Sequence, residues 1–236
     1  MRISAIVPVL YEEPQLAETI RRLDALRDRL DLQILVVVDI PDSDREAAVR
    51  SSIDPVVAIG GAEVLYRVGE RGFGSALRFA FAHAAGDAMV PIMADVSEDP
   101  MDVVRMSEAL DGGLDVAAGS RYMRGGGIVG NTPKQRISRV YSVLVRLASG
   151  IPIHDVSNAF KLYRRTVVEQ VPTLAESFDI SVELTLKAHQ AGFRIGEIPT
   201  VWTNRVAGRS NFTFWRELRN YGRWLVLAAR ARLRCS

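Results

Sequence analysis

The sequence predicts an α/β fold in which a mostly parallel central sheet is covered by helices on both faces. Short apolar runs rich in β-branched residues alternate with longer segments whose apolar residues recur at helical spacing. This alternation is typical of strand–helix–strand units, which pair their strands in parallel. The 236 residues, 48% apolar and 25% charged, are enough for one large globular domain. Because no linker or internal repeat is evident, we expect a single domain over residues 1–236.

The first half of the chain gives the clearest alternation. Residues 3–9 form an apolar, β-branched run, and residues 14–30 follow with Leu16, Ile20 and Leu23 at helical spacing. The same reasoning predicts strands over residues 33–39, 64–68, 88–94 and 115–119, and helices over residues 45–52, 72–85 and 101–110.

The second half is less regular and begins with three consecutive glycines at positions 125–127. An amphipathic helix is expected over residues 135–149 and another helix over 180–191. Short strands are expected over residues 160–163 and 195–201. We expect the loops between these elements to shape a binding site.

Arginines are concentrated at the C-terminal end, although the formal net charge is only +2. Only Glu217 opposes a basic set that comprises Arg205, Arg209, Arg216, Arg219, Arg223, Arg230, Arg232 and Arg234. Aromatic and aliphatic residues are interspersed with them from position 212 to 233. Two structures fit this tail: an amphipathic helix in a bilayer interface, or ordinary packing on the domain.

The expected location is the cytoplasm. The first strand pattern begins at once, without a basic leader or a cleavage site. Cys235 is the sole cysteine, so no internal disulfide is expected. No window reaches the roughly 18 apolar residues that a membrane-spanning helix needs. Any membrane contact would therefore be peripheral and on the cytoplasmic face.

Carboxylates follow several of the expected strands. In an open parallel sheet, ligands bind beyond the carboxyl ends of the strands. Asp39 and Asp95 come directly after apolar strands, where a carboxylate loses water unless it meets a ligand, a metal or a hydrogen-bond donor. Asp42, Ser43 and Asp99 are equally explained as helix N-caps. Asp39 and Asp95 are therefore the leading site candidates.

A glycine-rich turn over residues 69–74 follows the third expected strand. Its spacing and its position do not match the dinucleotide fingerprint, which follows the first strand, so no nicotinamide site is expected. Glycines at a helix start allow a ligand to approach the backbone and leave amides for an anion. Gly72 and Gly74 thus predict proximity to phosphate or sugar, with plain packing as the alternative.

Seven stretches carry a family resemblance through their order along the chain. They are residues 7–12, 72–76, MADVSEDP at 93–100, GSRY at 119–122, DVSNAFKLY at 155–163, EIP at 197–199, and 205–210. Together they resemble glycosyltransferase family 2, specifically its dolichyl-phosphate mannose synthase branch with the GT-A fold. The resemblance implies a nucleotide-sugar half over residues 1–120, an acceptor half over 121–211 and a basic amphipathic tail over 212–236.

For the donor, the resemblance implies a base and ribose pocket lined by Pro8, Leu10, Glu12 and Asp39. Asp95 corresponds to the last acid of the family's Asp-x-Asp motif and would bind Mg²⁺ or Mn²⁺, with Ser97 as a further ligand. Met93 stands where the family has its first acid. The metal would therefore have one firm acidic ligand rather than two.

For transfer, the resemblance implies catalytic roles for Asp95, Arg121 and Asp155. Arg121 would hold phosphate, and Asp155 would be the acid beside the acceptor or would brace the following strand. Arg136 and Arg139 would hold phosphates of the donor or acceptor, with a solvated helix face as the alternative. The remaining substrate contacts implied by the matching stretches are Gly72, Gly74, Lys161, Arg205 and Ser210, the last two on a loop over the diphosphate.

The resemblance thus implies an inverting glycosyltransferase that moves mannose or another hexose, from GDP-mannose or a UDP-hexose, to a polyprenyl or dolichyl phosphate. No nucleic acid partner is expected. One alternative is a hydroxyl acceptor, for which Asp155 would be the base. The others are a sugar-phosphate nucleotidyltransferase, which the non-glycine turn after the first strand disfavours, and a non-catalytic nucleotide-sugar-binding protein, which Met93 makes credible.

Overall fold

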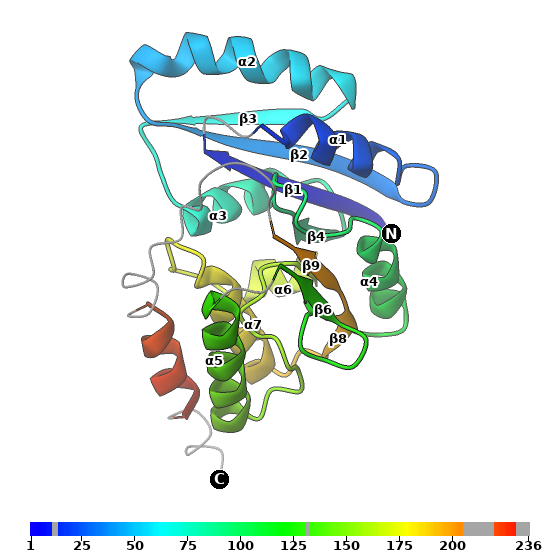
Figure 1. Cartoon of the computed structure of the whole chain (residues 1–236), viewed down its shortest axis with the longest axis vertical. Helices are drawn as coiled ribbons and strands as arrows, with labels where there is room; N and C mark the ends of the chain where they lie inside the picture. The colour runs from blue at the N-terminus through cyan, green and yellow to red at the C-terminus, as the bar shows by residue number, and fades with distance from the viewer. Residues whose placement is uncertain (11–13, 131–132, 205–219, 230–236) are drawn as a thin grey trace.

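The computed structural model describes residues 1–10, 14–130, 133–204 and 220–229, and it confirms the α/β class (Figure 1). Its main sheet has seven strands in the order β3-β2-β1-β4-β7-β5-β8. These strands are β1 (Arg2–Leu10), β2 (Asp31–Ile40), β3 (Glu63–Val68), β4 (Ala88–Pro91), β5 (Val116–Ser120), β7 (Lys161–Arg164) and β8 (Ile195–Pro199).

The sheet is mostly parallel, as predicted. β1 pairs in parallel with β2 and β4, β2 with β3, and β5 with β8. The exception is β7, which runs antiparallel between β4 and β5. Since the order of strands changes direction beside β1 and β4, their carboxyl ends form the edge where a ligand is expected.

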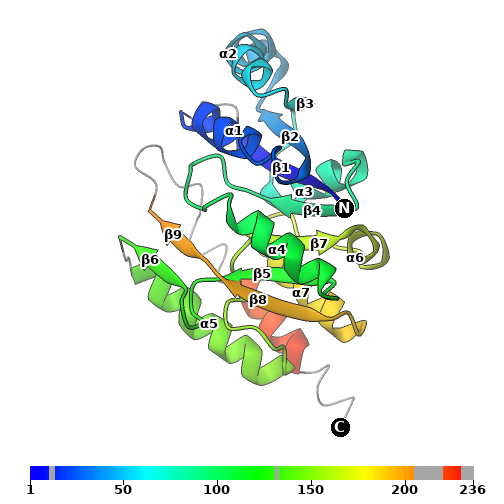
Figure 2. The same cartoon turned by 90° about the vertical axis from the view of Figure 1, so that its right-hand side faces the viewer.

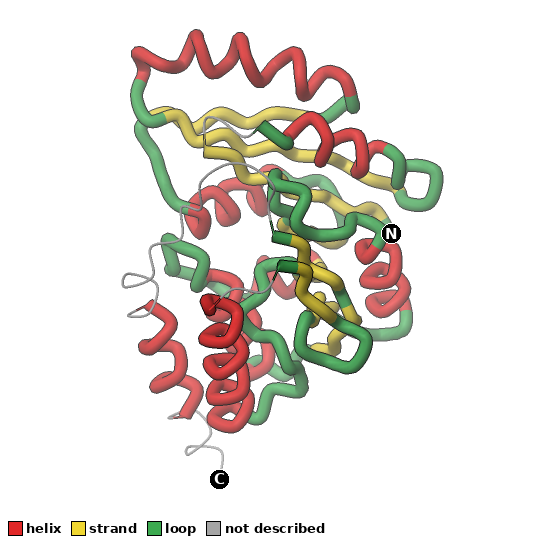
Figure 3. Tube along the Cα trace, viewed as in Figure 1, coloured by secondary structure: helices red, strands yellow, loops and turns green. Residues whose placement is uncertain are grey.

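Helices cover both faces of the sheet, as Figure 3 shows. They are α1 (Leu16–Asp24), α2 (Glu46–Ile59), α3 (Phe73–His83), α4 (Asp102–Asp111), α5 (Pro133–Ser149), α6 (Arg165–Gln170) and α7 (Ile180–Gln190), with a short 3₁₀ turn, η1 (Ser43–Arg45), before α2. The alternation of β1 explains the two layers. Ile6 packs in the core with α3 and α7, whereas Ala5 and Val7 pack in the core with α1, α2 and α4.

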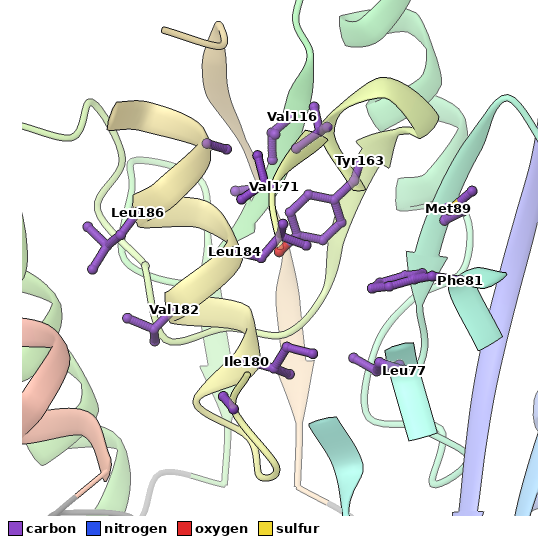
Figure 4. Close-up of a cluster of buried hydrophobic side chains, with 14 of the residues drawn as sticks. Leu77, Phe81, Met89, Val116, Tyr163, Val171, Ile180, Val182, Leu184 and Leu186 are labelled. Carbon is purple, nitrogen blue, oxygen red and sulfur yellow. The ribbon is translucent and has the colours of Figure 1, made fainter. Parts of the chain in front are cut away.

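Tyr163 of β7 is the largest fully buried side chain of the described residues. Figure 4 shows it among Leu77 and Phe81 of α3 and Ile180 and Leu184 of α7. Its hydroxyl lies 3.3 Å from the Thr185 hydroxyl, so its polar end is satisfied inside the core. The antiparallel strand is therefore anchored between the two halves of the fold.

Several boundaries differ from the predicted ones. α1 ends at Asp24, because residues 25–30 form successive turns rather than a further helix. β4 ends at Pro91 rather than at residue 94, and α6 was not predicted. A second sheet pairs β6 (Gly127–Val129) with β9 (Val201–Thr203). Three-residue strands carry too little periodicity to be predicted from sequence.

Residues 220–229 form a helix that packs beside α5 (Figure 2). Trp224 is 6% exposed and donates from Nε1 to Asp179 Oδ2 at 2.7 Å. Arg223 Nη2 donates to the same oxygen at 2.9 Å. The packing alternative therefore holds for this part of the basic tail, whose remainder lies outside the described residues. No helix among the described residues is long and apolar enough to cross a membrane.

Candidate functional site

A row of three side chains lies at the carboxyl ends of β1, β2 and β3. The strand register pairs Leu10 with Asp39 and Asp39 with Arg67. Pro8 and Leu10 are half-buried, while Asp39 and Arg67 are only 5% and 6% exposed. Sequence reasoning did not single out Arg67. Its signal in the sequence is an arginine inside a mostly apolar strand, and the strand pairing of the structure places it directly opposite Asp39.

Asp39 and Arg67 form a buried ion pair whose hydrogen bonding is incomplete. Arg67 Nε lies 2.8 Å from Asp39 Oδ1, but neither atom has hydrogen-bond geometry. Asp39 Oδ2 accepts from Arg67 Nη2 at 3.4 Å and from the Gly72 amide at 3.2 Å. Burial raises the pKa of Asp39, and the Arg67 charge and Gly72 amide offset this only in part. Such a carboxylate is suited to accept further hydrogen bonds from ligand hydroxyls.

Both glycines of the turn before α3 lie close to the main chain of residues 175 and 176. A Cβ on Gly72 would lie 2.6 Å from the Glu176 carbonyl oxygen, and one on Gly74 would lie 2.1 Å from the Ala175 carbonyl oxygen. Gly72 also has a φ of +135°, which residues other than glycine rarely adopt. The geometry favours the packing alternative for Gly74, and a ligand contact at Gly72 stays a prediction.

Asp95 lies in a tight turn beyond the end of β4. It is 3% exposed, and its Oδ1 accepts from the Ser97 amide at 3.2 Å. Val96, between them, has a φ of +58°, which is strained for a β-branched residue. The Ser97 carbonyl accepts from the Thr203 amide of β9 at 2.9 Å, which ties this turn to the second sheet.

Glu98 turns back toward Asp95 and is a site residue that sequence reasoning missed. Its Oε2 accepts from the Met93 amide at 3.0 Å. Burial and, next in size, the neighbouring Asp95 charge raise the pKa of Glu98 to about 8, although the Met93 amide, Ser97 and Arg121 act in the opposite direction. The signal in the sequence is an acid within the matching stretch at 93–100, where Met93 supplies none.

The donor atoms around Asp95 fit a divalent cation. Two buried carboxyl groups lie close enough to disfavour double ionisation, which a cation would relieve. The Ser97 hydroxyl is buried next to Glu98 without a well-directed hydrogen-bond partner. Within the described residues no group of three or more acidic, histidine or cysteine side chains gathers, so protein ligands would be few. Mg²⁺ commonly binds in this way, with water and substrate phosphates completing its shell.

Arg121 and Asp155 form the most complete ion pair of the site. Arg121 Nε donates to Asp155 Oδ2 at 2.6 Å and Nη2 donates to Oδ1 at 2.9 Å, while the Arg121 amide donates to Oδ2 at 3.1 Å. The Asp155 side chain is 0% exposed and that of Arg121 is 11% exposed. Burial lowers the pKa of Arg121, but the charge and hydrogen bonds of Asp155 outweigh it and raise that pKa. Arg121 is therefore a fixed cation.

Three hydroxyls join this pair to α5. Arg121 Nη2 donates to Ser138 Oγ and to Ser157 Oγ, each at 3.3 Å. The Tyr122 hydroxyl donates to Ser138 Oγ at 3.0 Å, and the Arg139 guanidinium lies 5.9 Å from the Tyr122 ring centre. Arg139 is thus near the pair, although exposed. These serines are short, common residues 19 positions apart, and nothing local in the sequence marks them.

Arg136 and Lys161, both predicted to contact substrate, lie in different surroundings. Arg136 is exposed on α5, as its alternative of a solvated helix face expects. Lys161 is fully buried, and its Nζ donates to the carbonyls of Val156, at 2.8 Å, and Asn158. Burial lowers the pKa of Lys161 to about 7. Its geometry is that of a support for the turn that carries Asp155. Glu12, Arg205 and Ser210 lie outside the described residues.

The structure is similar to solved glycosyltransferases, which shows the GT-A fold. One is glucosyl-3-phosphoglycerate synthase from Mycobacterium tuberculosis in complex with Mn²⁺, uridine diphosphate and glucosyl-3-phosphoglycerate. It superposes with a TM-score of 0.68 at 18% identity over 96% of this chain and 78% of that one. Another structure of the same synthase, with Mg²⁺ and uridine diphosphate, also gives 0.68, at 19% identity over 96% and 77% of the two chains.

Curated relatives match at higher identity. A dolichol-phosphate mannosyltransferase of Pyrococcus furiosus is 33% identical over 89% of this chain and 59% of its own length. A polyprenol monophosphomannose synthase of Mycolicibacterium smegmatis is 32% identical over 64% of this chain and 59% of its own length. The chain thus spans about three fifths of these relatives. The model of glycosyl transferase family 2 matches residues 4–171, and the chain belongs to that family.

Proposed function

We propose that this chain transfers a hexose from a nucleotide-sugar to a polyprenyl phosphate, with inversion at the sugar. The family and the two relatives, both named for polyprenyl or dolichol phosphate mannose transfer, support the acceptor class. Mannose from GDP-mannose is the first donor to test, with UDP-hexoses next. Asp39 would accept hydrogen bonds from the nucleoside, beside Pro8, Leu10 and Glu12.

The observation that carries the proposal is the complete enclosure of Asp155. Both of its oxygens accept from Arg121, and it has no exposed surface. A hydroxyl acceptor would need a base to take its proton. Asp155 is poorly placed to act as that base, because Arg121 occupies both of its oxygens. A lipid monophosphate, whose second pKa is about 6, is already largely ionised at neutral pH and needs no strong base. The geometry therefore supports a phosphate acceptor.

Asp95, with Glu98 and Ser97 beside it, would hold Mg²⁺ or Mn²⁺. A metal bound there neutralises charge on the donor diphosphate. Arg121 stabilises negative charge on a phosphate with a guanidinium that Asp155, Ser138 and Ser157 keep in one orientation. Asp155 then acts by positioning Arg121, and Lys161 acts by supporting the turn that carries Asp155. Arg205 and Ser210 are proposed to close over the diphosphate.

The test is transfer of labelled sugar from GDP-mannose and UDP-hexoses to polyprenyl phosphate, with Mg²⁺ or Mn²⁺. We expect a sugar phosphate lipid as product. Asp95→Asn should lower transfer by about 100-fold or more, since charge stabilisation of the leaving group is lost. Asp99→Asn is the matched control, because Asp99 is exposed and its Oδ1 accepts from the Met101 amide as a cap.

Other outcomes identify the alternatives. A product formed only with a polyprenol indicates a hydroxyl acceptor. A pyrophosphate-linked product from sugar phosphate and nucleoside triphosphate indicates a nucleotidyltransferase. Binding of nucleotide-sugars without turnover under every condition indicates a non-catalytic protein and removes the proposal.

A further inference from the structure

Thr200 lies between β8 and β9, at the corner where the main sheet leads into the second sheet. It is 1% exposed. Its amide donates to the Ser120 carbonyl at 3.1 Å, and its carbonyl accepts from the Gly127 amide at 3.0 Å. Its hydroxyl donates to Oδ2 of Asp102, which is 2% exposed. Thr200 therefore connects β5, β6 and α4 through three hydrogen bonds.

The contact with α4 ties this corner to one side of the candidate site. α4 begins at Asp102, just after residues 95–100, which we call the metal turn because they include the proposed metal ligands. The Asp102 amide donates to the Asp99 carbonyl in that turn at 3.0 Å. From the same corner, the Thr203 amide donates to the Ser97 carbonyl at 2.9 Å. The metal turn is thus bound to the corner by a side chain and by main chain.

The contact with β5 ties the same corner to the other side of the site. Ser120 ends β5 and directly precedes Arg121. Its hydroxyl oxygen accepts from the Met123 amide at 3.2 Å, which orders the turn after β5. Arg121 lies near enough to Glu98 of the metal turn for its charge to act against the raised pKa of that carboxyl. The two sides that the corner connects are therefore neighbours across the site.

The hydroxyl is the part of this corner that depends on the residue type. The main-chain bonds of Thr200 could form with any residue except proline, whereas the bond to Asp102 needs a side-chain donor. The other oxygen of Asp102 accepts from Arg105, whose side chain is 50% exposed. A hydrogen bond to a buried carboxylate is stronger than one between neutral groups at the surface. Thr200→Val would remove this bond and keep the shape of the side chain.

We propose that the Thr200 hydroxyl positions the metal turn relative to Arg121 for sugar transfer. This role rests on the proposed function, in which the metal turn lies at the donor diphosphate and Arg121 at the acceptor phosphate. In that transfer an acceptor phosphate oxygen forms a bond to the anomeric carbon while the bond from that carbon to the diphosphate breaks, and its electrons leave with the nucleoside diphosphate. A misplacement of about 1 Å can lower such a rate by about 100-fold.

The experiment compares Thr200→Val and Thr200→Ser in the whole chain. The assay contains GDP-mannose, or the UDP-hexose that the wild type uses, with Mn²⁺ and a short-chain polyprenyl phosphate in detergent. We expect Thr200→Val to lower kcat by about 10- to 100-fold. The donor KM should stay the same, as should the calorimetric Kd and stoichiometry for the nucleoside diphosphate with Mn²⁺, because the donor side itself stays intact. Thr200→Ser keeps the hydroxyl and should restore kcat.

Thr185→Val is the matched control. Thr185 is also buried, and its hydroxyl donates to the Ser181 carbonyl at 2.6 Å inside the core. Its loss should affect stability but leave kcat per nucleotide-binding site unchanged. Should Thr200→Val fail to fold, Thr200→Val with Asp102→Leu replaces it, because an apolar pair leaves no buried oxygen unpaired.

A second measurement tests the positioning role without turnover. Bound Mn²⁺ speeds the ³¹P relaxation of a phosphate near it, and the effect falls steeply with distance. With GDP and Mn²⁺ present, we expect fast relaxation of the short-chain polyprenyl phosphate in the wild type and in Thr200→Ser. Relaxation should be slower in Thr200→Val, because the two sides are no longer held together.

The positioning role would be overturned by a wild-type kcat in Thr200→Val, or by a fall in kcat that only follows a loss of nucleotide-binding sites. An equal fall per site in Thr185→Val, or equal ³¹P relaxation in the wild type and Thr200→Val, would also overturn it. Failure of the proposed function has a different result. The wild type would then transfer no sugar, while its ³¹P relaxation would still differ from that of Thr200→Val.

Discussion

The two halves of the site contain buried ion pairs of different quality. The Asp39 and Arg67 side chains, which we propose lie beside the donor and call the donor pair, approach to 2.8 Å with poor hydrogen-bond geometry, and burial leaves the pKa of Asp39 raised. Arg121 and Asp155, which we propose lie beside the acceptor and call the acceptor pair, share two side-chain hydrogen bonds. Asp155 also accepts from the Arg121 main-chain amide, and Arg121 donates to the Ser138 hydroxyl. A well-satisfied pair is a fixed part of the structure. An incompletely satisfied one can exchange a partner for a ligand.

The largest expected effect is on the acceptor pair. Asp155→Asn leaves the Arg121 guanidinium buried and charged, so the free energy of unfolding should fall by about 3–5 kcal/mol. Urea unfolding followed by circular dichroism measures it. Glu18→Gln is the control, because Glu18 pairs with Arg21 and Arg22 in the open and should leave the unfolding curve unchanged. A similarly small loss at both positions would contradict the structural role of Asp155.

Lys161, beside the acceptor pair, should make the stability of the protein depend on pH. Burial lowers the pKa of Lys161 to about 7, from an ordinary value near 10.5, despite the Asp155 charge. Between these values the unfolded chain binds a proton that the folded protein does not, so stability should rise with pH by about 1.4 kcal/mol per unit above pH 7. Lys161→Met removes this slope. Chemical unfolding at pH 7, 8 and 9 compares the two proteins, and parallel curves would show that Lys161 keeps its ordinary pKa.

Gly74 joins the two halves by packing against Ala175. Gly74→Ala places a Cβ 2.1 Å from the Ala175 carbonyl oxygen, so the backbone must move and stability should fall by about 1–3 kcal/mol. Gly112→Ala is the control, because its Cβ would meet nothing closer than 3.4 Å. If Gly74→Ala instead folds normally but loses nucleotide affinity, the glycine serves ligand approach rather than packing.

Features that depend on local patterns could be predicted from the sequence, whereas features that depend on long-range pairing could not. Strand and helix periodicity identified β1 to β5, and the rule that ligands bind at strand ends selected Asp39 and Asp95. The antiparallel course of β7 and the short β6 and β9 depend on long-range pairing that leaves no local pattern. Arg121 and Asp155 are separated by 34 positions, and their bidentate pairing follows only from the fold.

The residues that support the site through contacts with other elements were the hardest to predict. Arg67 and Ser138 are common residue types whose role depends on a partner in another element. Glu98 was visible as an acid in a family motif, yet only its return to the Met93 amide places it beside Asp95. Lys161 was predicted from the family stretch as a substrate contact, whereas burial against two carbonyls indicates support. In each case the missing information is tertiary.

The smallest expected stability effect is at the donor pair, where the functional effect should dominate. Asp39→Asn leaves Arg67 with Ser75 at 2.9 Å and Glu70 at 3.5 Å, and it removes a carboxylate that burial disfavours. We expect a loss of about 1 kcal/mol, the usual value of one hydrogen bond. Nucleotide affinity by calorimetry should fall about tenfold, since the ligand loses a charged acceptor worth ~1.5 kcal/mol or more. A stability loss equal to that of Asp155→Asn, with unchanged nucleotide affinity, would mean that both pairs are structural and that the donor nucleoside is held elsewhere.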